Sequence, residues 1–292
     1  MKIAALCNDD YANFMYCQVS AMKQAGLNID GYKLQRSPFI YRNECRITRP
    51  GLIRNIRADV FIIFHSHIEL LSYVDRSNNP RIIVVHTGTR FRQNSARIID
   101  DTKDFEHVIA LPEFATSLPN AHYIVGCIDD KLISPMPVFN NLFGHFPSNP
   151  VVKGTETIRR VSKMAKVDVF IDTNRLPNDE HLKRIAAFDI IVEMHNPIQD
   201  GYAYGSFGMQ ALEAAAMGRV VITNNVNGME LYQRTYGNCE LEIANTEQEL
   251  FRKLTHWKHA DTISKSERVV AWYREKHSMA ATGRRWAEVL GG

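Results

Sequence analysis

The chain has 292 residues, of which 45% are hydrophobic and 23% charged, and its net charge is +3. These values are ordinary for a globular protein, and the length allows two domains of modest size. No apolar run approaches the roughly 20 residues needed to span a bilayer, so we expect no membrane span, no signal peptide and a cytoplasmic location. Five scattered cysteines without C-x-x-C spacing favour reduced thiols and argue against a zinc ribbon.

Strands and helices alternate from the N-terminus. Residues 2–7 form a short apolar run, residues 14–25 have helical periodicity, and residues 29–34 predict a second strand. A strand, a helix and a strand in this order predict a βαβ unit, and hence a parallel sheet with helices on both faces. The first loop, NDDYANF, lacks the glycine-rich pattern of dinucleotide-binding enzymes, which argues against an oxidoreductase.

Residues 33–57 are compositionally distinct. They contain seven Lys or Arg residues and one acid, Glu44, which gives a local excess of six positive charges. Arginines interleaved with Phe39 and Tyr41 suit contact with phosphates and stacking on bases or sugars. A solvated charged surface explains the same residues equally well. If all six charges met DNA phosphates, the affinity would fall with salt at a log-log slope of about −5.

Two further apolar strands, at residues 60–64 and 81–85, are each followed by a histidine. His65 follows the first strand, and His86 follows the second in the segment HTGTR, which ends at Arg90. Open α/β sheets place their ligand sites at the carboxyl ends of strands, so we expect these side chains to point into one cleft. A hydrogen-bonded structural histidine is the alternative for His86.

His65 and His67 form a His-x-His pair that could in principle hold a metal ion. Alternation in an extended segment would direct the two rings to opposite sides. No cluster of Cys or carboxylate residues with metal-ligand spacing accompanies them. We therefore expect no metal site.

A proline-rich stretch, PMP, interrupts regular structure and predicts a domain boundary between residues 134 and 141. A cleft between two such domains is the preferred place for a ligand. The expected parts are an N-terminal domain of residues 1–137, a C-terminal domain of residues 138–270 and a C-terminal helix of residues 271–292.

The second half repeats the alternation of strands and helices. Asn178 and Asp179 are expected to cap a helix, so their polarity needs no further function. The predicted elements are strands at 142–146, 167–171, 190–192 and 220–222, and helices at 179–188, 246–256 and 261–290.

Lys153-Gly154-Thr155 stands at the expected start of a helix. A cation together with helix N–H groups would bind a diphosphate there. The order Lys-Gly and the lack of preceding glycines distinguish it from a P-loop. A surface lysine at a helix start is the alternative.

The segment of residues 200–224 predicts a loop, a helix, a turn and a buried strand. Gly205 and Gly208 permit close approach of a ligand to the backbone, and Ser206 can cap the helix. A helix N-terminus directs N–H groups and about half a positive charge at a phosphate. Glu213, further along the helix, can accept hydrogen bonds from a pair of ribose hydroxyls. The alternative is a core helix with a solvent-facing glutamate.

The segment GSFGMQALEAAAMGRVVIT resembles the nucleotide-sugar signature of family 4 type glycosyltransferases with the GT-B fold, which is framed by two glutamates separated by seven residues. Glu213 corresponds to the second glutamate, which binds the nucleotide ribose in that family. Gly205 stands where the family has the first glutamate, which holds the transferred sugar. Asp200 and Glu193 are nearby candidates to take its place, although nothing in the spacing requires it. Lys153 and Gly154 are similar to the family's Lys-Gly pair at the donor diphosphate, with Ser148 in place of a partner arginine.

HTGTR is similar to a His-Gly-Ser-Asp type segment of related glycosyltransferases, whose histidine lies beside the donor sugar. In these enzymes the first loop of the N-terminal domain faces the cleft between the domains. The resemblance therefore implies three groups of residues: catalytic His86, Arg90 and Lys153; donor-binding Lys153, Gly154, Gly205, Ser206, Phe207, Gly208 and Glu213; and, on the acceptor side, Asp9, Asp10, Tyr11, Asn13, His65, Arg42 and Arg46.

The resemblance implies an α/β fold of two Rossmann-like, doubly wound domains facing a cleft. It also implies sugar transfer from a UDP-, GDP- or ADP-sugar, with retention of configuration and without a cofactor or metal. The acceptor stays open between a saccharide or lipid-linked sugar and, because of the basic segment, a modified base in phage-type DNA. Two alternatives follow from the missing first glutamate and the fold: a nucleotide-sugar binding protein that no longer transfers, and a GT-B epimerase.

Overall fold

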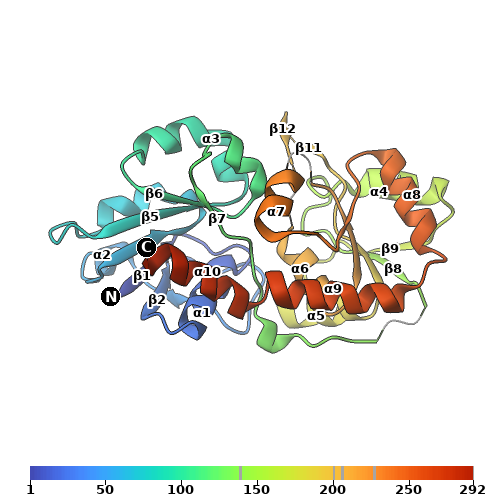
Figure 1. The fold of residues 1–292 in the computed structure, drawn as a ribbon, viewed down its shortest axis with the longest axis horizontal. Coiled ribbons are helices and arrows are strands. Elements are labelled where there is room, and N and C mark those ends of the chain that lie inside the picture. Colours follow the sequence, from blue (N-terminus) through green and yellow to red (C-terminus); the bar gives the residue numbers. More distant parts are fainter. Residues whose placement is uncertain (138–139, 200, 205–206, 226–227, 292) are drawn as a thin grey trace. The chain divides into compact units, whose positions relative to one another are not determined.

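The chain divides into two compact units in the structure, which is a computed structural model. The first unit contains Met1–Cys127 and the chain from Met279 onward, and the second contains Ile128–Ser278. A parallel β-sheet forms the centre of each unit (Figure 1). The residues that the structure describes are 1–137, 140–199, 201–204, 207–225 and 228–291.

The first unit is built on a sheet of seven parallel strands in the order β3-β2-β1-β4-β5-β6-β7. Helices α1 and α10 lie on one face of this sheet and α3 on the other (Figure 1). The strands are β1 Ile3–Cys7, β2 Ile29–Lys33, β3 Arg46–Ile47, β4 Val60–Ile63, β5 Arg81–His86, β6 Glu106–Ile109 and β7 His122–Tyr123; the helices are α1 Phe14–Gln24, α2 Pro50–Ile53, α3 Gly88–Asp101 and α10 Met279–Gly291.

All residues of β1 and β4 are buried, as expected of central parallel strands covered on both faces. The predicted βαβ unit is confirmed, and its strands and helix end within one residue of the expected positions. After β4 the chain forms two 3₁₀ turns, Phe64–Ser66 and Ile68–Tyr73, which the apolar periodicity did not predict.

The last helix, α10, packs along α1. The Trp286 indole N–H donates a hydrogen bond to Oε1 of Gln18 at 2.6 Å, and both side chains are buried. A Cβ atom at Gly283 would lie 2.3 Å from the carbonyl oxygen of Ala21, so the helices approach too closely for any other residue there. The end of the chain is thus an integral part of the first unit.

The second unit contains a sheet of five parallel strands in the order β14-β13-β10-β8-β9. Helices α4 and α8 lie on one face, and α5, α6 and α9 on the other (Figure 1). The strands are β8 Phe143–His145, β9 Val169–Ile171, β10 Ile190–Val192, β13 Val220–Thr223 and β14 Glu242–Ile243; the helices are α4 Thr155–Met164, α5 Asn178–Ala186, α6 Met209–Ala216, α7 Met229–Tyr236, α8 Glu247–Trp257 and α9 Thr262–Lys276.

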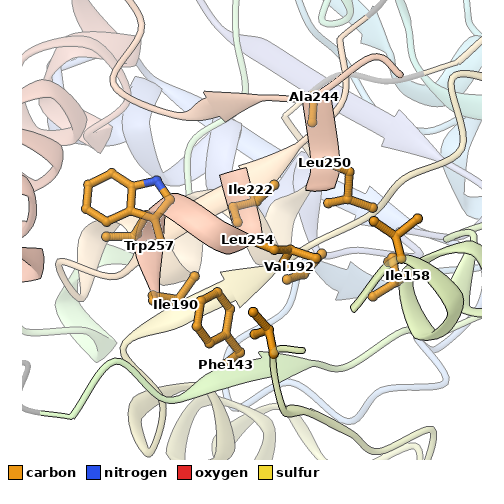
Figure 2. Packing of buried hydrophobic residues seen from close by; sticks show 12 residues of the cluster. Phe143, Ile158, Ile190, Val192, Ile222, Ala244, Leu250, Leu254 and Trp257 are labelled. Atoms are coloured by element: carbon orange, nitrogen blue, oxygen red, sulfur yellow. The ribbon is translucent and has the colours of Figure 1, made fainter. Parts of the chain in front are cut away.

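A cluster of apolar side chains packs between this sheet and helices α4 and α8 (Figure 2). Each fully buried aliphatic side chain there contributes roughly 1.5–3 kcal/mol relative to exposure. Twelve buried residues form the cluster: Phe143, Ile158, Val161, Val167, Ile190, Val192, Val220, Ile222, Ala244, Leu250, Leu254 and Trp257.

One prediction needs correction, and one short element was not predicted. The single helix expected at 261–290 is two helices, because α9 ends at Lys276 and α10 begins at Met279. A short antiparallel pair, β11 Ile198–Gln199 and β12 Tyr202–Ala203, was not predicted. No described helix is long and apolar enough to cross a membrane.

Candidate functional site

A buried ion pair lies at the carboxyl end of the sheet in the second unit. Glu193 directly follows β10 and is fully buried. Its Oε1 atom pairs with the ammonium group of Lys153, and its Oε2 atom accepts a hydrogen bond from the Thr223 hydroxyl at 2.8 Å. The Lys153 side chain is 15% exposed, whereas that of Glu193 is 0% exposed, so solvent and ligands can reach the cation only.

Lys153 belongs to a tight turn that precedes α4. The N–H groups of residues 153–155 donate to the carbonyl oxygens of residues 149–151 at 3.0–3.2 Å. These amides already have acceptors, so the ammonium is the group of this segment that can meet an anion. Gly154 has a φ of 69° and its absent Cβ would lie 2.0 Å from the carbonyl oxygen of His195, which requires glycine.

The same ion pair lies against the start of α6, whose N-cap residue is Gly208. A Cβ atom at Gly208 would be 2.6 Å from Oε1 of Glu193 and 3.4 Å from Nζ of Lys153. The first N–H groups of a helix lack intrahelical acceptors and carry partial positive charge. A cation and a helix N-terminus therefore converge here, which suits an anionic ligand.

Phe207 anchors the start of α6 by packing into an aromatic cluster. Its ring contacts those of Tyr232 and Trp272 edge-on, with centroids 4.9 and 5.9 Å apart. The Phe207 side chain therefore holds the start of α6 in place, and its ring packs against other side chains of the second unit. The predictions for Gly205 and Ser206, including the cap by Ser206, lie outside the described residues.

Glu213 of α6 is held in a buried polar cluster. Its Oε1 atom accepts a hydrogen bond from the Asn178 amide at 3.1 Å, and its Oε2 atom lies 4.0 Å from Nε2 of His181. Burial raises the pKa of Glu213 to about 7, and the hydrogen bond from Asn178 acts in the opposite direction. A ligand that donates hydrogen bonds to this carboxyl group would therefore favour its ionised form.

The cluster continues along α5. His181 Nδ1 accepts a hydrogen bond from Arg184 at 2.8 Å, and Arg184 also donates to Asp172 at 2.8 Å. Burial lowers the pKa of His181 to about 4, and the charge of Arg184 adds to this effect. The imidazole is therefore neutral at physiological pH. The Arg184 guanidinium lies 4.8 Å from the ring centroid of Phe146.

Asn178 does not have the capping role that the sequence predicted. The N-cap residue of α5 is Pro177, and no side chain caps this helix. The Asn178 side chain is buried and donates to Glu213 instead. The prediction was wrong because an Asn at a helix start is equally able to serve a neighbouring element.

His145, at the end of β8, was also missed. Its Nδ1 atom is 2.7 Å from the carbonyl oxygen of Val192, and its Nε2 atom is 2.9 Å from the hydroxyl of Thr155. Burial lowers the pKa of His145 to about 4. A neutral ring that donates from Nδ1 and accepts at Nε2 satisfies both contacts and fixes the first residue of α4 beside Lys153.

We expect Gly208→Ala to destabilise the protein by about 1–3 kcal/mol, because the new methyl group would displace the Glu193 carboxylate from Lys153. The backbone of Gly208, with φ −62° and ψ 160°, accepts alanine, so the cost is steric only. Chemical denaturation measures it. Gly51→Ala is the matched control, since its Cβ would meet nothing within 4 Å. Equal stability of both variants would contradict the close approach.

The first unit contains a separate polar cluster at its strand ends. Asp10 is fully buried, and its carboxylate accepts hydrogen bonds from the N–H groups of Met15 and Tyr16 at 2.8 and 2.9 Å. It also contacts Nε2 of His65 at 3.1 Å, while Nδ1 of His65 is 2.6 Å from the Thr87 hydroxyl. Asp10 thus holds both the start of α1 and the histidine ring.

The rings of His65 and His67 lie on the same side, contrary to the sequence-based prediction. Their centroids are 5.7 Å apart, in an edge-on arrangement. The alternation argument failed because the chain leaves the extended conformation at His65, with φ values of 59° at His65 and 56° at Ser66. The described residues contain no group of three or more His, Cys, Asp or Glu that could hold a metal ion.

His86 is fully enclosed in the first unit. Its Nδ1 atom is 3.0 Å from the Ser66 hydroxyl and its Nε2 atom is 2.9 Å from Nδ1 of His107. Burial lowers the pKa of His86 to about 3, and His107 acts in the same direction. Both ring nitrogens have partners within the unit, which favours the structural interpretation of this residue. Arg90 pairs with Glu69 at 2.6 Å on an exposed part of α3.

The remaining acceptor-side residues of the first loop lie near the surface or support the loop. Asp9 is 3.4 Å from Nε2 of His67, and the Tyr11 ring packs edge-on against Phe39 at 4.9 Å. Asn13 has a φ of 55° and donates from its side chain to the carbonyl oxygen of Asn43 at 2.9 Å.

The basic segment keeps most of its charge at the surface. Lys33 is the exception, because it is fully buried and pairs with Glu44 at 2.6 Å. Arg57 pairs with Asp75 at 2.7 Å. The six arginines of the segment are all exposed: Arg36, Arg42, Arg46, Arg49, Arg54 and Arg57.

The predicted site residues thus fall into two sets. The first set lies in the second unit, at α6 and at the carboxyl end of the sheet: Lys153, Gly154, Gly208 and Glu213. The second set lies in the first unit and contains the acceptor-side residues and His86. Glu193, which the sequence suggested only as a possible substitute for the missing glutamate, completes the first set. A sequence feature could have identified Glu193 as a site residue, because it is a charged residue that follows a buried strand without an intervening loop.

No protein-family model matches the sequence, and no curated protein matches it either. Solved structures do match. The Anabaena protein Alr3699/HepE, in complex with UDP and glucose, aligns with a TM-score of 0.68 at 12% identity, covering 100% of both chains. AviGT4, a glycosyltransferase involved in avilamycin A biosynthesis, aligns with a TM-score of 0.64 at 12% identity over 99% of this chain and 96% of its own.

WaaG, a glycosyltransferase involved in lipopolysaccharide biosynthesis, aligns with a TM-score of 0.56 at 13% identity, covering 99% of this chain and 100% of its own. At these identities the likeness concerns the fold. The alignments span both units and both of their parallel sheets. The chain therefore has the GT-B fold of glycosyltransferases, with one Rossmann-like sheet in each unit.

Proposed function

We propose that the protein transfers a sugar from a nucleotide-sugar donor to an acceptor. The observation that carries the proposal is the arrangement around α6: the Lys153 ammonium lies at its N-terminal Gly208, and the buried Glu213 lies further along the same helix. A diphosphate and a ribose diol are joined in a nucleotide sugar, and these two positions offer a cation for one and a carboxyl group for the other.

Lys153 would act mainly on the leaving group. Breaking the bond between sugar and diphosphate concentrates negative charge on the diphosphate, and a cation beside a helix N-terminus stabilises that charge. By resemblance to family 4 type enzymes, we further propose that the anomeric configuration is retained and that no metal is needed.

The acceptor is proposed as a saccharide or a lipid-linked sugar, as is ordinary for the family. The exposed arginines of residues 33–57 favour one specific rival, a modified base in phage-type DNA. Retention on DNA that falls steeply with salt would support the rival, whereas salt-independent behaviour would remove it.

A second candidate is a protein that binds the nucleotide sugar without transferring it, which the glycine at position 205 favours. Release of free nucleotide from the donor separates the two, because a binder would protect the donor. Conversion of the donor sugar without any acceptor would instead indicate an epimerase.

Thermal-shift measurements against UDP, GDP, ADP and their sugars test the shared first step. A ligand at about 100 times its dissociation constant adds about 2.7 kcal/mol of stability. We expect one nucleotide series to raise the midpoint, and Glu213→Ala to abolish that rise. Glu180→Ala, on the exposed surface of α5, should keep it. A full ligand response in Glu213→Ala would remove Glu213 from the site.

A further inference from the structure

Glu193 is a buried charged residue at the carboxyl end of β10. It is 0% exposed, and its backbone N–H still donates to the carbonyl oxygen of Ile222 at 2.8 Å, which continues the sheet beyond β10. Burying an ion pair is expensive, and replacing such a pair with apolar residues of similar size is often neutral or stabilising. The cluster that packs between β10 and helices α4 and α8 is apolar, and the other buried ion pair at this strand, Arg219 with Asp189, lies at its amino end. Stability alone therefore does not explain a charged residue at this position.

The position of the carboxylate is more informative. Its Oε1 atom lies 2.6 Å from the space that a Cβ of Gly208 would fill, directly at the N-cap of α6. A helix N-terminus with a lysine beside it attracts anions. In the structure the negative charge at this place belongs to Glu193, which is fixed from the other side by the Thr223 hydroxyl at 2.8 Å.

We infer that Glu193 is a positioning residue that sets the Lys153 ammonium against the first turn of α6 and opposes the binding of anions there. This inference rests on the proposed function, because it concerns the same diphosphate site. An incoming diphosphate must attract Lys153 while Glu193 still holds it. Glu193 thus orders the cation for the leaving group and at the same time lowers the affinity for free nucleotide diphosphate.

Opposite effects on affinity and on turnover are the signature of this role. We expect Glu193→Gln to bind inorganic diphosphate and UDP about 3–10-fold more tightly than the wild type, because a repelling charge is gone. We expect its transfer or donor-hydrolysis rate to fall by at least about 10-fold, because the Lys153 ammonium loses its fixed position. A merely destabilised site would lose both affinity and rate.

Isothermal titration with inorganic diphosphate and with UDP measures the affinity, and release of UDP from UDP-glucose measures the rate. Glu180→Gln, which removes the same charge from the exposed surface of α5, is the matched control and should bind like the wild type. Circular dichroism and thermal melting establish that Glu193→Gln is folded. As a second variant, Thr223→Val removes only the hydroxyl that fixes Oε2, and a smaller loss of rate is expected.

The outcomes separate the two proposals. Equal or weaker anion affinity in folded Glu193→Gln overturns the role of Glu193 and leaves the proposed function standing. Failure of the wild type to bind either inorganic diphosphate or any nucleotide diphosphate overturns the proposed function, and the inference with it. Tighter binding with an unchanged rate overturns the positioning role, because Glu193 would then only repel anionic ligands and would not position Lys153.

Discussion

Lys153→Met is expected to destabilise the protein by about 3–5 kcal/mol, because it leaves the buried carboxylate of Glu193 without its cation. Methionine has nearly the same length and packs well in irregular sites, so the packing loss is small and the electrostatic loss dominates. The free energy of unfolding, measured by chemical denaturation at pH 8, checks this value. Lys163→Met, which replaces an exposed lysine of the same unit, should change stability by less than about 0.5 kcal/mol.

A double variant separates the structural effect from ligand binding. In Lys153→Met with Glu193→Leu both charges are absent, so stability should return to near that of the wild type. Binding of inorganic diphosphate should not return, because the cation is still missing. A single variant that is as stable as wild type at pH 8 would show that Lys153 and Glu193 are not coupled.

The sequence predicted the elements of the fold well because their signals are local. Strands such as Val60–Ile63 and Ile190–Val192 are short apolar runs without polar interruption, and each lies in its sheet as expected. The helix at 209–216 lies within residues 200–224, where the sequence predicted a helix after a glycine-containing loop. The edge strand Arg46–Ile47 carries no such run, since both of its residues are exposed, and it was missed.

The site was harder to predict because its side chains come from separate segments. The sequence singled out Lys153 and Glu213, but it did not predict that they contact Glu193 and Asn178. Asn178 is a good N-cap residue by type, so its contact with Glu213 across two helices left no trace in local spacing. For His86 the sequence suggested a role in the site that its contacts do not support. A histidine at a strand end is typical of a ligand site, and only the structure reveals that Ser66 and His107 occupy both ring nitrogens.

Glu213→Gln should make the protein more stable at pH 8 by about 3 kcal/mol and remove part of its pH dependence. The folded-state pKa of Glu213 is about 7, against an ordinary value of 4.5. The folded protein therefore holds this proton more tightly than the unfolded chain. The stability that this proton contributes is fully present below about pH 4.5 and is lost as the pH rises through 7, and the difference corresponds to about 3 kcal/mol. Glutamine keeps an acceptor for Asn178 and carries no charge at any pH.

The effect of Glu213 is obtained from the difference in unfolding free energy between variant and wild type, because other groups change the stability with pH in the opposite direction. Burial lowers the pKa of His67 and His86 to about 3 and that of His145 to about 4, so these histidines increase stability as the pH rises towards 6.5. Urea denaturation of both proteins from about pH 4 to pH 8 should give stability curves that converge at the acid end, separate as the pH rises from about 4.5 to 7, and keep a constant separation above pH 7. Parallel curves would mean that Glu213 is ionised without penalty.

The same proton couples stability to the proposed ligand. Ribose hydroxyls that donate to Glu213 favour the ionised carboxylate, so nucleotide binding should release the proton and bring the pKa of Glu213 down. The wild-type dissociation constant for UDP should then rise by up to about tenfold per pH unit below pH 7. Glu213→Gln should retain only the dependence that comes from the phosphates of UDP itself. Identical pH profiles for UDP binding in the two proteins would place the ribose away from Glu213, even if both bind the nucleotide.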